Sequence, residues 1–150
     1  MNCRGLTGPE PEATITPGHL QNALAMDTLH EHFMRKALEV AQQGLDQGEL
    51  PIGAVVVLDN QVIAAAHTRE RAENRLLVHA DLLALETADR LQPFPGKRRD
   101  ARLYVNLEPC LMCLGAAMSF FIGAIYYVVA VRGRAVEIEA DAVTGEGLIG

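Results

Sequence analysis

Two short groups of residues in this chain have the types and spacing of metal ligands. His79 and Asp81 stand two apart in one group. Cys110 and Cys113 stand three apart in the other, directly after Pro109. Side chains three apart on a helix share a face, so both sulfurs can reach one ion. One imidazole and two thiolates suit zinc, and three protein ligands leave a tetrahedral position open for water. The pattern predicts one zinc ion per chain, held by His79, Cys110 and Cys113.

The Cys-x-x-Cys spacing taken alone leaves other interpretations open. It also occurs in redox motifs and in structural zinc sites. A structural zinc requires a fourth protein ligand, and His67 is the nearby candidate. The proline before the first cysteine and the His-x-Asp group favour the open, catalytic kind of site.

Asp81 is the candidate general acid and base. A carboxylate two residues after a ligand histidine can take a proton from the attacking water. It can then pass protons to a ring nitrogen and to a leaving amine of the substrate. The alternative is an ordinary acid in the first turn of a helix, stabilised by the helix dipole. We favour the catalytic role.

Hydrophobic periodicity predicts the elements that must position these groups. The expected elements are a helix from Thr28 closed by Gly44 and Gly48, a strand over Ile52–Leu58, a turn at Asp59-Asn60, a strand over Val62–Ala66, a helix over His79–Leu91, a strand over Leu103–Asn106, a helix with Pro109 in its first turn, a strand over Ala124–Val131 and a last strand over Val136–Ile138. This order predicts an α/β fold with three layers, α-β-α, in which a hairpin comes first and parallel strands come later.

Composition limits the classes of partner. The chain has 150 residues, which favours one domain, and a net charge of −6, which argues against tight binding to a long nucleic acid.

The stretch from Leu111 to Val131 carries no charge and is long enough to cross a membrane. Because Gly115 and Gly123 divide it, we interpret it as a helix followed by a buried strand. Three cysteines and the lack of a secretory signal pattern favour the cytoplasm.

The sequence resembles the cytidine deaminase superfamily, and within it the tRNA adenosine deaminase and guanine deaminase branch. The likeness spans roughly residues 28 to 131. It is carried by His79-Ala80-Asp81, by Pro109-Cys110-Leu111-Met112-Cys113, by the stretch from His32 through Glu49-Leu50-Pro51-Ile52-Gly53-Ala54-Val55, and by Leu103-Tyr104-Val105-Asn106-Leu107-Glu108. The resemblance implies a mixed sheet of about five strands between helices and a homodimer. It also implies a deaminase domain over residues 28–150. The prolines and glycines near the start of the chain predict a flexible tail over residues 1–27.

Three departures from the family pattern bear on the site. The family has Glu where this chain has Asp81, one methylene shorter. The branch commonly carries a substrate-contacting Asn where this chain has Thr68. The region after Val131 looks shortened, and in the tRNA enzymes the later parts help to hold the anticodon stem. The resemblance makes four residues candidate substrate contacts: Ala80, Pro51, Ile52 and Thr68.

The function expected from the resemblance is zinc-dependent hydrolytic deamination of a nucleobase, nucleoside or related amino-heterocycle, with release of ammonia. tRNA adenosine deaminase is the alternative substrate assignment, disfavoured by the acidic charge and the shortened end. A different class is a zinc-holding, deaminase-like protein with little catalysis that acts as a binding module. The apolar run through Met118, Phe120 and Phe121 is expected to lie near the homodimer contact.

Overall fold

The described part of the chain, residues 17–92 and 98–130 of a computed structural model, contains one mixed sheet with the strand order β2-β1-β3-β4. The strands are β1 (Gly53–Leu58), β2 (Gln61–His67), β3 (Arg102–Leu107) and β4 (Ala124–Val129). Strand β1 pairs antiparallel with both β2 and β3, and β3 pairs parallel with β4. The predicted order of a hairpin followed by parallel pairing is confirmed, with four strands in these residues where about five were expected.

The hairpin between β1 and β2 has the tight turn that the sequence predicts. Asp59 and Asn60 have φ angles of 50° and 59°. Positive φ at both central residues is the requirement of a type I′ turn, whose twist matches that of paired strands. All six residues of β1 are buried, which explains its continuous apolar run.

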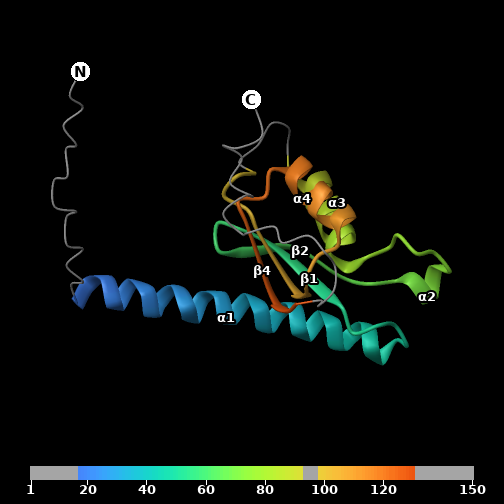
Figure 1. Ribbon diagram of the computed structural model, residues 1–150, viewed down its shortest axis with the longest axis horizontal. Coiled ribbons are helices and arrows are strands. Elements are labelled where there is room, and N and C mark those ends of the chain that lie inside the picture. The colour runs from blue at the N-terminus through green and yellow to red at the C-terminus, as the bar shows by residue number, and fades with distance from the viewer. Residues whose placement is uncertain (1–16, 93–97, 131–150) are drawn as a thin grey trace, which may run out of the picture.

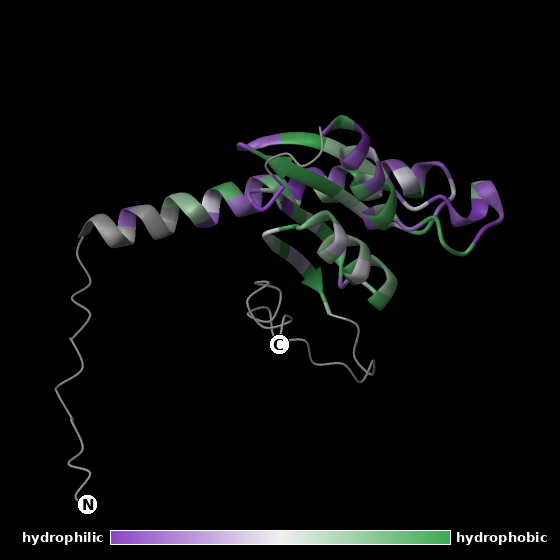
Figure 2. Cartoon of the chain, turned by 90° about the horizontal axis from the view of Figure 1, so that it is seen from above, coloured by the Kyte–Doolittle hydropathy of each residue, from purple (hydrophilic) through white to green (hydrophobic). Residues whose placement is uncertain are grey.

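Helices cover both faces of the sheet (Figure 1). The long helix α1 (Pro17–Asp46) lies along one face, and α3 (Ala80–Leu91) and α4 (Leu111–Phe120) lie on the other. The short helix α2 (Glu70–Glu73) precedes α3. The predicted three-layer α-β-α architecture is therefore confirmed. Figure 2 shows hydrophobic residues gathered in the strands and hydrophilic ones on α2.

Alternating side chains of β1 divide the core in two. Val55 and Val57 face α1, where they pack in a cluster with Phe33, Ala37 and Tyr104. Ala54 and Val56 face the layer of α3 and α4. Helix α3 contributes a row of fully buried alanines to that second cluster, at four-residue spacing: Ala80, Ala84 and Ala88. Small side chains on this row let the α3 backbone approach the sheet closely.

Several boundaries differ from the sequence-based expectation. Helix α1 begins at Pro17, well before Thr28, so residues 17–27 are helical where a flexible tail was expected. Proline is well tolerated at the first helical position. Helix α2 was not among the elements expected from the sequence. The uncharged stretch is divided as predicted, into α4 and β4, and no helix in residues 17–92 and 98–130 is long and apolar enough to span a membrane. The predicted strand over Val136–Ile138 and the shortened end lie outside the described residues.

Gly53 is where α1 meets the sheet most closely. A Cβ added there would lie 2.3 Å from the backbone nitrogen of Ala41 and 2.4 Å from the carbonyl oxygen of Ala37, both in α1. Backbone atoms of a packed helix cannot yield as a flexible side-chain tip would, so any larger residue must push α1 away from β1.

We expect Gly53→Ala to lower the free energy of unfolding by about 1–3 kcal/mol, as overpacking does. Chemical denaturation followed by circular dichroism measures it. Gly115→Ala is the matched control, because Gly115 lies on the exposed side of α4 and an added Cβ there meets nothing within 4 Å. Alanine should stabilise that helix by about 0.5–1 kcal/mol. Equal stability of the two variants would contradict this account of the α1–β1 contact.

Candidate metal centre

The starts of α3 and α4 bring the predicted metal ligands together. His79 is the N-cap of α3, Cys110 is the N-cap of α4, and Cys113 lies in the first turn of α4. The two helices pack side by side on one face of the sheet (Figure 1). Pro109 was expected inside the first turn; that detail is wrong, because α4 begins at Leu111 and Pro109 precedes the cap.

The three side chains have the spacing of a tetrahedral zinc site. Nδ1 of His79 lies 3.5 Å from Sγ of Cys110 and 3.5 Å from Sγ of Cys113, and the two sulfurs are 3.6 Å apart. Bonds of about 2.3 Å to sulfur and about 2.05 Å to nitrogen, at tetrahedral angles, imply S···S distances near ~3.8 Å and N···S distances near ~3.6 Å. The residues present therefore fit a zinc ion.

The chemistry of the donors also favours a cation. Cys113 is fully buried, and burial, together with the adjacent Asp81 and Cys110, raises the pKa of its thiol. A thiolate in that position requires a positive charge close by, because an isolated buried anion is strongly unfavourable. A bound zinc ion meets this requirement.

His79 is oriented by a residue that the sequence analysis did not single out. Its Nε2 lies 3.1 Å from Oε1 of Glu70, on the side opposite the sulfurs. A ligand histidine commonly donates its second ring N–H to a carboxylate, which fixes the tautomer and directs the other nitrogen to the metal. No spacing rule in the sequence connects Glu70 to His79.

Asp81 lies beside the same group of ligands. It is a buried acid, with 4% of its surface exposed, and its carboxylate is within hydrogen-bonding reach of the Cys113 thiol. Its Oδ1 also accepts a hydrogen bond from the backbone N–H of Leu82, at 3.1 Å. The first turn of α3 therefore holds the carboxylate in one place, as a helix N-terminus favours.

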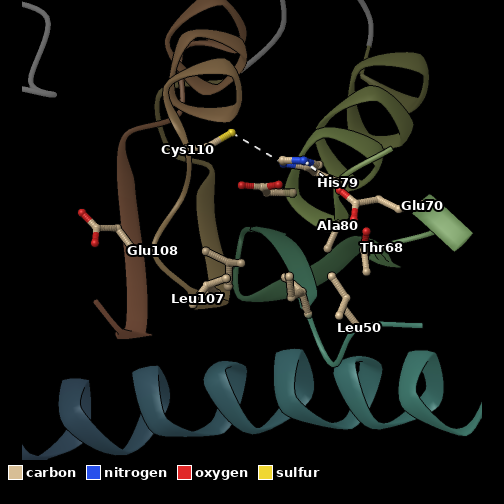
Figure 3. A pocket seen from close by; sticks show the side chains of 11 residues that line it. Leu50, Thr68, Glu70, His79, Ala80, Leu107, Glu108 and Cys110 are labelled. Carbon is tan, nitrogen blue, oxygen red and sulfur yellow. Dashed lines mark hydrogen bonds and ion pairs between the residues drawn. The ribbon is translucent and has the colours of Figure 1, made fainter. Parts of the chain in front are cut away.

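A pocket of about 210 Å³ opens over these groups (Figure 3). In this view, Cys110 and His79 point toward one another at one end of the pocket. Glu70, Thr68 and Leu50 lie on one side, and Leu107 and Glu108 lie on the other. The lining consists of Leu50, Ile52, Thr68, Glu70, His79, Ala80, Asp81, Val105, Leu107, Glu108 and Cys110.

Three of the four predicted substrate contacts reach this pocket. Ile52, Thr68 and Ala80 are part of the lining. Pro51 is not; its carbonyl accepts a hydrogen bond of 2.8 Å from the amide of Asn106, which also accepts one from the backbone of Gly53 at 2.9 Å. Asn106 thus ties the segment before β1 to β3, and no spacing rule in the sequence indicates that contact.

His67 does not join the ligands. Its Nδ1 is 2.7 Å from the backbone carbonyl of Thr68, and the potential metal group in the described residues consists of His79, Cys110 and Cys113 alone. Residues 17–92 and 98–130 therefore offer no fourth protein ligand that would close the site. The arrangement matches the open kind of zinc site.

A three-layer α-β-α fold with such ligands at two helix starts defines a class of zinc-binding domain, and comparison with known families identifies the class. The family described as the cytidine and deoxycytidylate deaminase zinc-binding region matches residues 27–129. The chain belongs to this family. The resemblance inferred from the motifs is confirmed, and zinc is the metal of the matched region.

Individual relatives divide between two substrates. The chain is 38% identical over 91 residues to the tRNA-specific adenosine deaminase of Bacillus subtilis, covering 61% of this chain and 56% of that one. It is 40% identical over 99 residues to the enzyme of the same name from Agrobacterium fabrum, covering 64% and 62%. The guanine deaminase structure from Bacillus subtilis superposes with a TM-score of 0.61 at 32% identity, over 67% of this chain and 64% of that one.

The chain thus spans little more than half the length of the curated relatives it matches. The argument from acidic charge against a tRNA substrate finds no support in these comparisons, because several relatives are tRNA-specific deaminases.

We expect the purified protein to contain about one zinc per chain by elemental analysis, and Cys113→Ser to lose most of it. A hydroxyl is a poor substitute for a thiolate in a set of three ligands, so the loss of affinity should exceed the about 10–100-fold typical of outer partners. Cys3→Ser is the control, since Cys3 belongs to neither motif. Wild-type protein that neither contains nor takes up zinc would contradict the assignment.

Proposed function

We propose that this protein is a zinc-dependent hydrolytic deaminase of a nucleobase, nucleoside or related amino-heterocycle. The observation that carries the proposal is the placement of a buried carboxylate, Asp81, beside three converging zinc ligands at the inner end of a pocket. Family membership supports the same reaction class.

The proposed reaction exchanges an amino group for an oxygen. Water adds to the ring carbon that bears the amine, the C–N bond breaks, and ammonia leaves while the ring keeps the oxygen as a carbonyl. The chemistry that zinc supplies when bound is the activation of a water molecule at neutral pH. Asp81 accepts the proton that the attacking water loses and passes it to the ring nitrogen. It then takes the remaining proton of the added hydroxyl, which becomes the carbonyl, and delivers that proton to the departing amine.

The pocket lining supports an uncharged, flat substrate. Leu50, Ile52, Val105 and Leu107 supply apolar surface for a ring. Glu70, Asp81 and Glu108 supply carboxylates, and no lysine or arginine is among the described residues that line this pocket. A phosphate placed among carboxylates would be repelled, so a base or nucleoside fits better than a free nucleotide.

Adenosine in tRNA is the second candidate substrate. The names of the Bacillus subtilis and Agrobacterium fabrum relatives favour it, and so does a structure of tRNA:A34 deaminases with a TM-score of 0.58 at 40% identity, over 65% of this chain and 74% of that one. The chemistry at Asp81 would be the same. The difference would lie in contacts outside the pocket.

The proposal extends to a cytoplasmic protein. Cys110 and Cys113 are free thiols, and ligands of this kind stay reduced in the cytoplasm.

A panel assay of ammonia release tests the function. Zinc-loaded protein is offered amino-bases, their nucleosides, their monophosphates and a tRNA anticodon stem-loop. We expect turnover of at least one base or nucleoside and much slower turnover of its monophosphate. Release from the stem-loop alone would select the second candidate, and no release from any compound would favour the binding-module class.

Substitutions of Asp81 are the controls for that assay. Asp81→Asn should keep zinc and lose about 100-fold or more in turnover, the usual contribution of a positioned acid and base. Asp81→Glu should also reduce turnover. The carboxylate of Asp81 is buried against Cys113, so an added methylene must move the carboxylate from its place. Unchanged turnover in Asp81→Asn with zinc bound would rule out the catalytic role.

We further propose a homodimer that uses the exposed surface of α4. Met118 is 47% exposed and Phe121 is 55% exposed, whereas Phe120 is buried in the core and is not available. Apolar surface of this kind marks interaction sites. Light scattering should give a dimer at micromolar concentration, and Met118→Glu should shift it toward monomer. Leu45→Glu, on equally exposed α1 surface, should not. A wild-type monomer would contradict the proposal.

A further inference from the structure

We propose that Glu49 is a positioning residue for the metal centre: it anchors α2, and α2 holds Glu70 against the ring of His79. The inference deepens the proposed function, since it rests on His79 being a zinc ligand. Glu49 lies before β1, thirty positions from His79 in the sequence, and does not line the pocket. Its effect on the metal is therefore indirect.

Glu49 caps α2 from a distant part of the chain. Its Oε1 accepts a hydrogen bond from the backbone N–H of Ala72 at 2.7 Å, and its Oε2 accepts one from that of Arg71 at 3.1 Å. These first-turn N–H groups have no partner within a helix. Arg69, the residue at the N-cap position, supplies no side-chain hydrogen bond. A carboxylate from outside the helix therefore performs the capping, and it complements the helix dipole.

The carboxylate of Glu49 is buried, with 2% of its surface exposed. Burial favours the neutral acid, but the N–H donors of Ala72 and Arg71, with the charges of Arg71 and His67, outweigh it and hold the pKa of Glu49 below its ordinary value. The guanidinium of Arg71 also donates to the carbonyl of Gly48 at 2.7 Å, so α2 is attached to this loop at three points.

Anchoring α2 fixes Glu70, because Glu70 is its first residue and directly precedes Arg71. Oε1 of Glu70 lies 3.1 Å from Nε2 of His79, while Nδ1 of that ring faces both sulfurs at 3.5 Å. The backbone N–H of Arg69 donates to the carbonyl of Val78 at 3.0 Å, which ties the start of α2 to the residue before the ligand. If α2 moved, Glu70 would lose its contact with Nε2, and the orientation and tautomer of the His79 ring would no longer be fixed.

Glu73 provides a matched comparison within the same helix. Its carboxylate pairs with Arg69 at 3.4 Å and with Arg75 at 2.8 Å. Its partners are exposed arginines, and ion pairs with exposed partners contribute little to stability. Loss of one negative charge from α2 can therefore be separated from loss of the contacts made by Glu49 and Glu70.

The test uses the full chain and measures zinc affinity by competition with a chromogenic chelator. Glu49→Gln places an amide N–H donor against a backbone N–H, and Glu70→Ala removes the partner of Nε2. Each should weaken zinc binding by about 10–100-fold, the usual effect of losing an outer partner. The double variant should lose no more than Glu70→Ala alone, because the two residues act in series. Glu73→Gln should bind zinc like the wild type.

Two further measurements distinguish a positioning role of Glu49 from a purely structural one. The visible spectrum of the cobalt-substituted protein should change in Glu49→Gln and not in Glu73→Gln, and thermal unfolding of the metal-free variants shows whether each is folded. A folded Glu49→Gln with wild-type zinc affinity and an unchanged cobalt spectrum would overturn the inference. A wild-type chain that binds no zinc would instead overturn the proposed function.

Discussion

The close packing of α3 on the sheet is the contact on which the metal centre depends. Ala80, Ala84 and Ala88 lie on the buried row of α3 and are fully covered. Larger side chains on that row would lift the helix from the strands, and the position of His79, which caps the helix, would move with it. On α4, the neighbouring Ala117 is equally buried. The distance between the two helix starts is therefore set by packing some way from the ligands.

The same geometry collects anionic groups. Two thiols and the carboxylates of Glu70 and Asp81 lie close to His79, at the positive ends of two helix dipoles. That is a poor arrangement for an empty cavity and a good one for a divalent cation. One cluster thus provides both the ligands for a cation and, in the buried carboxylate of Asp81, a base beside the pocket.

Sequence patterns predicted the features that depend on neighbours along the chain. The burial of β1, the turn at Asp59-Asn60 and the ligand pair of α4 all follow from local spacing. The start of α1 was missed because Pro17-Gly18 resembles a turn and only the packed part of a helix shows clear periodicity. The contact of Glu49 with α2 could not be predicted, because it depends on the path of an irregular loop. Such a path leaves no periodic pattern in the sequence.

The ligands also lie far apart in the chain. His79 and Cys110 are separated by 31 positions, with the whole of α3, β3 and the loop between them enclosed. An ion held by both would act as a cross-link, removing the entropy that this segment has in the unfolded chain. Because such an ion binds the folded form far better than the unfolded one, the melting temperature would rise with the concentration of free zinc. The stability of this domain would then be a property of its surroundings as much as of its sequence.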